Sequence, residues 1–243
     1  MTDRGASALR QSADRFTVGP SSMRWQDGQL IVEIDEWGAP PLVSRVRGRV
    51  TVTPRALTAV ELPLTPDGAH VWRPFAPDCD IAVALDAPGW HWAGHGYFDA
   101  NFGTRALEAD FSRWTWGRFP TSSGATCFYD ATRRDGTRLA TGIRFDGQGN
   151  ACEITPPPRA RLPRSLWAVA RETRADPGYR PRQVLPMLDA PFYCRSAVRT
   201  MIDGHETTGV HEALDLDRFR LAALKPMLAV RVPRRARWTF PRE

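Results

Sequence analysis

Short segments in which apolar and polar residues alternate recur along the chain, and turn dipeptides separate them. The segments are LIVEIDEW (30–37), RGRVTVT (47–53), AVELPL (59–64), DIAVALD (80–86) and CFYDAT (127–132). The dipeptides typical of hairpin corners are Asp27-Gly28, Asp67-Gly68, Asp135-Gly136 and Asp146-Gly147. A period of two places successive side chains on opposite faces of a strand. The pattern therefore predicts an antiparallel all-β fold.

Two segments favour helix, residues 7–14 and the arginine-containing stretch 165–174. A proline cluster, TPPPRARLP (155–163), cannot sit inside a sheet. It predicts a loop or an inter-sheet crossing within the second half of the chain, not a flexible interdomain linker. The terminal stretch RVPRRARWTFPRE (231–243) is basic and aromatic, which suits either a tail at a membrane surface or a solvated end without a partner.

The length of 243 residues is enough for one large β domain or two smaller ones. No apolar run is long enough for a helix that spans a bilayer. Charges in MTDRGASALRQSADRF occupy the place where a secretory signal has its apolar centre, so we expect a cytoplasmic protein.

Four cysteines lie far apart without a CxxC pair, which predicts free thiols: Cys79, Cys127, Cys152 and Cys194.

The net charge of +6 and the pI near 9.7 suit either nucleic acid or an anionic membrane surface as a partner. Lys225 is the single lysine among 33 basic residues. An arginine bias of this kind arises as easily from genomic composition as from function. Charge alone therefore does not choose between these partners.

The stretch GHGYFDANFG (94–103) places polar residues at alternate positions among glycines and aromatics. Two glycines within three residues weaken a helix, which favours a strand. In a strand, one face would carry His95, Tyr97, Asp99 and Asn101. The other face would carry Trp92, Phe98 and Phe102. The first face has the residue types of a chemical site and the second those of a packed core.

Aromatic and histidine residues concentrate around this stretch. Five of the nine tryptophans and three of the five histidines fall between residues 70 and 116: Trp72, Trp90, Trp92, Trp114, Trp116, His70, His91 and His95. A barrel core is the commoner explanation of such a cluster. Asp99 argues against it, because a carboxylate flanked by aromatics is hard to explain as a surface residue.

Metal and nucleotide sites are not indicated. His91 and His95 have the spacing of helical zinc ligands, but they lie in an expected strand and the Glu of HExxH is missing. Asp99-x-Asn101-x-Gly103 imitates a calcium loop with its glycine one position early. In the second half, His205-Glu206 and His211-Glu212 either supply polar groups to a cavity or, as is commoner, make structural contacts on a strand face.

The segment GHGYFDANFGTRALEADFSRWTWGRF (94–119) resembles the signature of the acyclic carotenoid 1,2-hydratases, also called hydroxyneurosporene synthases, of purple phototrophic bacteria. That signature is roughly GxGYxDxNxG, then LE, then WxWxR. Further segments resemble the family in the same order: MTDRG, VGPSSMRW, IDEW, RVRGRVTVTP, HVWRPFAP, PPPRARLPRSLW, APFYCRS and HEALDLDRF. The resemblance covers nearly the whole chain.

This resemblance implies two lipocalin-like antiparallel β-barrel or sandwich domains, here 1–103 and 104–243. It implies a lyase without a cofactor or metal that adds water across the terminal C1,C2 double bond of neurosporene or lycopene, giving a tertiary alcohol. The family residues implicated in hydration match His70, Trp72, Tyr97 and Asp99. Family members carry a further N-terminal segment before the part that matches MTDRG, so the resemblance also implies that the first barrel lacks its first strands.

The residues suggest how the reaction proceeds. Protonation of the alkene at C2 leaves the positive charge on C1, so the donor must be a neutral acid. Burial raises the pKa of an aspartic acid from near 3.9 by up to about 3 to 5 units. Asp99 fits this role, Trp72 is the first choice to stabilise the cation, and Tyr97 or His70 would orient the water or take its proton. The residues expected to contact substrate are Trp92, His95, Asn101, Trp114 and Trp116.

A carotene resides in bilayers, so we expect peripheral contact with lipid of the inner or photosynthetic membrane. One alternative is a lipocalin-like carrier of carotenoid or lipid, which would leave Asp99 without a task. Another is a nucleic-acid-binding β protein, which needs exposed aromatics interleaved with basic residues. In this sequence the aromatics surround an acid, and nucleic acid is not an expected partner.

Overall fold

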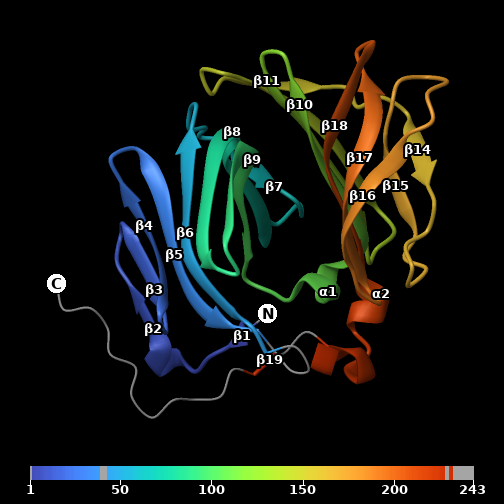
Figure 1. Cartoon of the computed structure of the whole chain (residues 1–243). Helices are drawn as coiled ribbons and strands as arrows, with labels where there is room; N and C mark the ends of the chain where they lie inside the picture. Colours follow the sequence, from blue (N-terminus) through green and yellow to red (C-terminus); the bar gives the residue numbers. More distant parts are fainter. Residues whose placement is uncertain (1, 39–42, 228–229, 232–243) are drawn as a thin grey trace. The chain divides into compact units, whose positions relative to one another are not determined.

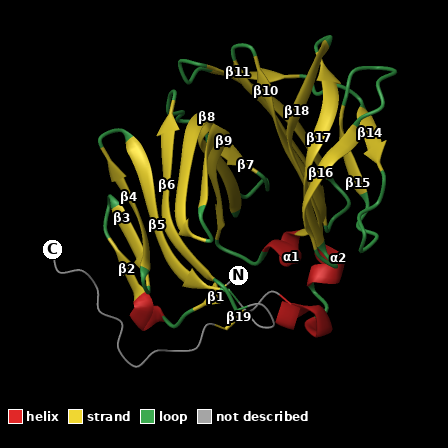
Figure 2. Ribbon diagram, in the orientation of Figure 1, coloured by secondary structure: helices red, strands yellow, loops and turns green. Residues whose placement is uncertain are grey.

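The computed structural model describes residues 2–38, 43–227 and 230–231, and strands make up most of it (Figures 1 and 2). The strands of the first half are β1 (Thr2–Asp3), β2 (Leu9–Gln11), β3 (Arg15–Val18), β4 (Ser21–Gln26), β5 (Gln29–Trp37), β6 (Arg45–Pro54), β7 (Leu62–Pro63), β8 (His70–Ala87), β9 (Trp90–Gly103) and β10 (Phe111–Thr121). Those of the second half are β11 (Gly124–Arg133), β12 (Arg138–Asp146), β13 (Ala151–Ile154), β14 (Arg159–Leu162), β15 (Arg171–Arg174), β16 (Arg182–Asp189), β17 (Tyr193–Ile202), β18 (His205–Asp215) and β19 (Val230–Arg231). The short helices are η1 (Ala6–Ala8), α1 (Leu107–Asp110), α2 (Leu216–Phe219) and η2 (Ala222–Met227). The predicted antiparallel all-β fold is confirmed, with a parallel pair between β1 and β19.

The chain divides into two compact units, each assembled from separate stretches. Unit 1 comprises residues 1–55, 79–98 and 226–243, and unit 2 comprises residues 56–78 and 99–225. The long strands β8 and β9 each pass from one unit to the other. The two domains expected at 1–103 and 104–243 stay a prediction. Sequence reasoning did not anticipate that residues 56–78 join the second unit.

Unit 1 contains the sheet order β2-β3-β4-β5-β6-β8, with antiparallel neighbours. Asp27 and Gly28, with φ of 51° and 75°, form the corner between β4 and β5. Two positive φ values are what a tight hairpin turn requires. Gly48 lies at a bulge opposite β8, where an added Cβ would come within 2.2 Å of the Ala84 carbonyl oxygen. Glycine is therefore required at the bulge.

Unit 2 contains the sheet order β13-β12-β11-β10-β18-β17-β16. Among the described residues its end strands, β13 and β16, do not pair with each other, so the sheet is open. Side chains directly opposite each other on paired strands share a face. One face carries Trp114, Trp116, Tyr129 and Glu212, and the other carries Thr115, Asp130 and His211. The first of these two faces holds the candidate site.

The hairpin of β14 and β15 packs on the face that carries Asp130 and His211. Arg174 Nε donates to Asp130 Oδ2 at 2.9 Å, and both side chains are buried. His211 Nε2 lies 2.8 Å from the Glu172 carbonyl oxygen. Burial lowers the pKa of His211 to about 4, so this imidazole is neutral at physiological pH and serves the packing of unit 2.

The strand expectations agree with the structure at most positions. Residues 30–37, 47–53, 80–86 and 127–132 lie within β5, β6, β8 and β11. The segment AVELPL contributes only the two residues of β7. In the expected proline loop, residues 155–158 are outside the strands, whereas Arg159–Leu162 forms β14 and pairs with β15.

Both helix predictions are wrong. In the stretch 7–14, η1 ends at Ala8 and Leu9–Gln11 pairs with β3. In the stretch 165–174, a turn leads into β15, which pairs with β14. An isolated helix of this length has a costly nucleus and few internal hydrogen bonds. Pairing with a neighbouring strand satisfies the same backbone groups and prevails.

Two further expectations concern the basic tail and helices that could span a bilayer. Of the expected basic tail 231–243, all but Arg231 lies outside the described residues. In the described ranges, none of the helices combines the length and the hydropathy needed to cross a bilayer.

Candidate active site

Asp99 is held by the indole of Trp72 within unit 2. Trp72 lies on β8 with 1% of its surface exposed, and its Nε1 donates to Asp99 Oδ2 on β9 at 2.8 Å. Burial raises the pKa of Asp99 above its ordinary value of 3.8, while the Trp72 hydrogen bond and the positive charge of Arg195 oppose that rise. The net shift favours the neutral acid, which can donate a proton.

Aromatic rings surround the Trp72 indole. Its centroid lies 6.4 Å from that of Trp116 and 5.7 Å from that of Tyr129. Trp114 packs on Tyr129 at 5.9 Å, nearly edge-on. The register of β10 with β11 causes this arrangement, because Trp116 is directly opposite Tyr129 and Trp114 is two residues away on the same face. Asp99 therefore has an indole-rich environment within its own unit.

Asn101 joins this group through a hydrogen bond. The hydroxyl of Tyr129 donates to Asn101 Oδ1 at 3.3 Å. Asn101 follows Asp99 by two positions on β9, which accounts for their common face. Burial raises the pKa of Tyr129 well above its ordinary value, and the charges of Asp99 and Glu212 add to that rise, so the hydroxyl remains protonated.

His70 is engaged by a different carboxylate. Its Nε2 lies 2.7 Å from Asp110 Oδ2, and its ring packs against Phe111 at 5.2 Å. Arg105 binds the same carboxylate, with 3.0 Å between Nε and Oδ2, and holds the pKa of Asp110 below its ordinary value. His70 itself is 2% exposed. The two residues of β8 that were predicted to act in hydration therefore bind different carboxylates. Trp72 contacts Asp99, whereas His70 contacts Asp110.

Three predicted residues lie on the part of β9 that belongs to unit 1. Trp92 is 53% exposed, and His95 is exposed with its Nδ1 3.8 Å from Asp80 Oδ1. Tyr97 is half-buried and precedes Asp99 by two positions on the strand. The predicted roles of these three residues stay predictions.

Three site residues escaped the sequence reasoning: Tyr129, Tyr193 and Arg195. Glu212 was considered only as part of the His211-Glu212 pair, for which a structural contact was the commoner explanation. Arg195 Nη1 lies 3.3 Å from Glu212 Oε1, and Tyr193 also bonds the Glu212 carboxylate. The available signals for Tyr193, Arg195 and Glu212 were the segments APFYCRS and HEALDLDRF, in which these three residues alternate with buried ones. In the described parts of the chain, the His, Cys, Asp and Glu side chains do not form a group of three or more that could hold a metal ion.

Comparison with known proteins identifies relatives along the whole chain. The family model for carotenoid hydratase CrtC matches residues 1–241. A protein named acyclic carotenoid 1,2-hydratase from Cereibacter sphaeroides is 62% identical over 240 residues, covering 99% of this chain and 86% of the relative. Another of the same name from Rhodobacter capsulatus is 60% identical over 239 residues, covering 98% and 85%. A third, from Thiocapsa roseopersicina, is 44% identical over 235 residues, covering 96% and 58%.

A solved structure shares the fold. The crystal structure assigned as AttH from Nitrosomonas europaea aligns with a TM-score of 0.56 and covers 87% of this chain and 73% of that one. The identity is 14%, so this likeness concerns the fold alone.

Proposed function

Because the chain belongs to the carotenoid hydratase family, we propose that it adds water across the terminal C1,C2 double bond of an acyclic carotene and forms the 1-hydroxy derivative. The observation that carries the chemistry is the raised pKa of Asp99 beside the Trp72 indole. A protonated carboxyl in a poorly solvated site can transfer its proton to a hydrocarbon.

Proton transfer from Asp99 to C2 leaves a tertiary cation at C1. An indole face stabilises a desolvated cation by about 2 kcal/mol. Trp72 and Trp116, with ring centroids 6.4 Å apart, supply two such faces near the acid. Trp114 extends the aromatic surface along β10. Asn101 and the Tyr129 hydroxyl supply polar contacts at the same place.

His70 and Tyr97 keep supporting roles in this proposal. The contacts of His70 with Asp110 and Phe111 suit a residue that orients the start of β8, and with it the adjacent Trp72. Tyr97 shares the face of β9 with Asp99 and would orient the water or the end of the polyene. The predicted contacts of Trp92 and His95 with the substrate stay predictions.

Incubation of the purified protein with neurosporene or lycopene in detergent micelles tests this function. We expect a product heavier by one water, with the hydroxyl on the terminal tertiary carbon. Carotene that binds without conversion would instead support a lipocalin-like carrier. Lack of both binding and product would contradict the proposal.

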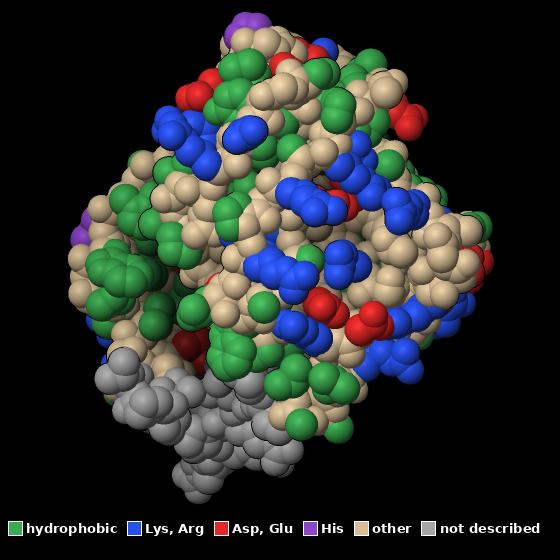
Figure 3. All heavy atoms as spheres, turned by 90° about the vertical axis from the view of Figure 1, so that its right-hand side faces the viewer, with side chains coloured by type: hydrophobic (Ala, Val, Ile, Leu, Met, Phe, Trp, Pro, Cys, Tyr) green, Lys and Arg blue, Asp and Glu red, His purple; other side chains and the backbone are tan. Residues whose placement is uncertain are grey.

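We also propose that the protein contacts an anionic bilayer through unit 2. Arg113, Arg161, Arg164 and Arg171 line a cavity of about 330 Å³ beside the hairpin of β14 and β15. Figure 3 faces this side of unit 2 and displays basic side chains gathered next to hydrophobic ones. The edge strand β16 exposes Val184, Leu185, Met187 and Leu188, and the loop between β14 and β15 exposes Leu166 and Trp167. Basic and apolar groups together suit an anionic lipid surface.

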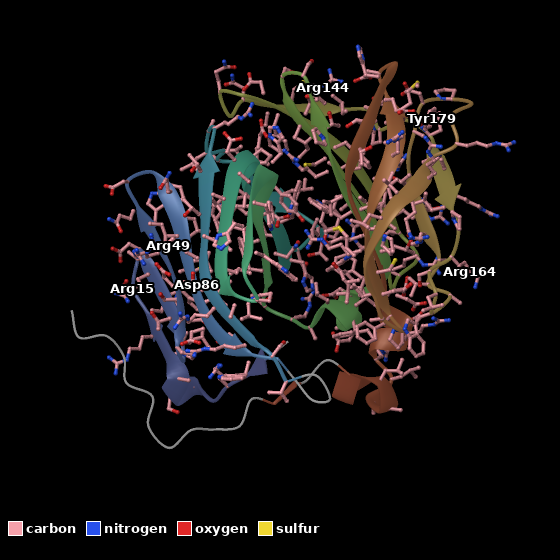
Figure 4. The ribbon with its side chains drawn as sticks, in the orientation of Figure 1. Arg15, Arg49, Asp86, Arg144, Arg164 and Tyr179 are labelled. Atoms are coloured by element: carbon pink, nitrogen blue, oxygen red, sulfur yellow. The ribbon has the colours of Figure 1, made fainter. Side chains whose placement is uncertain are left out.

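Flotation with vesicles that contain phosphatidylglycerol is expected to carry the protein at low salt and to carry less at high salt. Each arginine near the surface contributes about 1 kcal/mol, so the double variant Arg161→Ser/Arg164→Ser should weaken partitioning by on the order of tenfold or more. The double variant Arg15→Ser/Arg49→Ser removes the same charge from β3 and β6 of unit 1 (Figure 4) and serves as the control. Equal losses in both variants, or no flotation at low salt, would contradict this contact.

A further inference from the structure

A row of four side chains crosses the sheet of unit 2 beside Asp99. Tyr129 on β11 is opposite Trp116 on β10, Trp116 is opposite Glu212 on β18, and Glu212 is opposite Arg195 on β17. Directly opposite residues on antiparallel strands project from the same face. The four side chains therefore form one line, with the Trp116 indole between Tyr129 and Glu212.

Glu212 is a second carboxyl in the environment of Asp99. Only 19% of its side chain is exposed, and burial raises its pKa above the ordinary value. The Arg195 guanidinium and a Tyr193 hydrogen bond oppose this rise, whereas the negative charge of Asp99 adds to it. Burial also raises the pKa of Tyr193, so its hydroxyl stays protonated and can donate to the Glu212 carboxylate.

The two carboxyls have different partners. Asp99 accepts from the neutral Trp72 indole, whereas Glu212 lies 3.3 Å from the charged Arg195 guanidinium. A cationic partner favours the ionised form of a carboxyl more than a neutral donor does. Two nearby carboxyls also resist carrying two negative charges. The ion pair with Arg195 therefore favours the ionised form of Glu212, which a general base requires.

The row also sets the distance between its outer members. Neighbouring strands are about 4.8 Å apart, so the backbones at Tyr129 and Glu212 are separated by roughly 10 Å. The Trp72 ring, which holds Asp99, contacts both Trp116 and Tyr129. Indole surface thus lies between the acid and the second carboxyl, where a cation would form.

We propose that Glu212 is the general base that accepts a proton from the attacking water, with Arg195 and Tyr193 as positioning residues. The proposal rests on the hydratase function put forward above. In the first step the Asp99 O–H bond breaks, and the π electrons of the alkene form the C2–H bond. In the second step the water oxygen bonds to C1 and one water proton passes to Glu212. The products are the tertiary alcohol, protonated Glu212 and ionised Asp99, and proton transfer through solvent water from Glu212 to Asp99 restores the starting state.

Glu206 provides a matched control on the same strand. It also has an arginine and a tyrosine as partners, with Arg199 Nη1 at 3.4 Å and the Tyr179 hydroxyl at 2.7 Å. Its side chain is 47% exposed, in contrast to Glu212. The two glutamates therefore share strand and partner types but differ in burial and in proximity to Asp99.

Charged and titratable groups on β9, β11 and β17 act electrostatically on Asp99 or Glu212 or on each other. These groups are Asp99, Cys127, Tyr129, Tyr193 and Arg195.

In Glu212→Gln the hydration rate is expected to fall by about 10²-fold or more. The loss of rate at acid pH, which arises from protonation of Glu212, should disappear from the pH profile. Glu206→Gln should retain the wild-type profile and a rate within about twofold of wild type.

Arg195→Gln separates a positioning role from a merely structural one. Removal of the guanidinium charge raises the pKa of both Glu212 and Asp99, so both limbs of the pH profile should move to higher pH. A variant that only loosens the fold would lower the rate without this shift.

Infrared titration of protonated carboxyl groups tests the pair without any turnover. Loss of the negative charge in Glu212→Gln should move the Asp99 titration to lower pH, and Asp99→Asn identifies that band. A folded Glu212→Gln variant with unchanged titration and unchanged rate would overturn the role of Glu212. Absence of product from the wild-type protein would refute the hydratase proposal. In that case, an Asp99 titration that is unchanged in Glu212→Gln would also refute the coupling of the two carboxyls.

Discussion

Asp99→Asn is expected to lower the rate of carotene hydration by about 10²- to 10⁴-fold. The amide oxygen can still accept the Trp72 hydrogen bond, which spans 2.8 Å in the wild-type protein. The amide cannot supply the acidic proton that the alkene requires. The loss should therefore appear in kcat, with carotene binding unchanged. The measurement is the initial rate of product formation by mass spectrometry, together with carotene affinity from absorbance.

Asp80→Asn is the control for that experiment, because Asp80 is an exposed carboxyl of β8 paired with Arg55 at 3.4 Å. It should hydrate carotene at close to the wild-type rate.

The pH profile gives a second check on Asp99. Its protonated form is the active one, so activity should fall as pH rises through its pKa, which lies above 3.8. An Asp99→Asn protein that keeps both its rate and this alkaline limb would exclude Asp99 as the proton donor.

Asp130→Ala is expected to destabilise unit 2 by about 3 to 5 kcal/mol. Asp130 is buried and accepts from Arg174 Nε at 2.9 Å and from Arg159 Nη2 at 3.1 Å. Without the carboxylate, the buried Arg174 guanidinium loses its compensating charge. Removal of one partner of a buried ion pair costs far more than the net contribution of the intact pair. Denaturant unfolding, followed by tryptophan fluorescence, measures the change.

Two further variants separate this effect from ordinary loss of an ion pair. Glu61→Ala breaks the exposed pair with Arg73, which spans 3.2 Å in the same unit, and should cost less than about 1 kcal/mol. The double variant Asp130→Leu/Arg174→Met removes both charges and should recover much of the lost stability. If the double variant is no more stable than Asp130→Ala, the uncompensated charge is not the cause.

The strand framework of the site follows from local sequence. Residues 94–103 alternate in character and form part of β9, and Trp114 and Trp116 alternate on β10. Such regularities are visible because the period of a strand depends on neighbouring positions alone. The same argument placed Asp99 and Asn101 on one face, as the structure shows for the Tyr129 contact with Asn101 and the Trp72 contact with Asp99.

The remainder of the site depends on register between distant strands. Trp116 meets Tyr129 through one pairing and Glu212 through another, although Glu212 is almost a hundred positions further along the chain. No local pattern specifies which residue of β18 stands opposite Trp116. His70 illustrates the same limit, since its contact with Asp110 depends on how the start of β8 meets α1. The two mistaken helices were also decided by strand partners that the local sequence does not reveal.

The interleaving of the two units constrains how the protein can be dissected. Unit 2 draws residues 56–78 from the first half of the chain, and these include Trp72. Expression of residues 99–243 as a fragment would therefore omit the indole that binds Asp99, and residues 1–98 would carry that indole without its acceptor. Cleavage at Phe98 would leave neither piece with the intact acid–indole pair, so a genetic split of this enzyme calls for co-expression and reassembly of both halves.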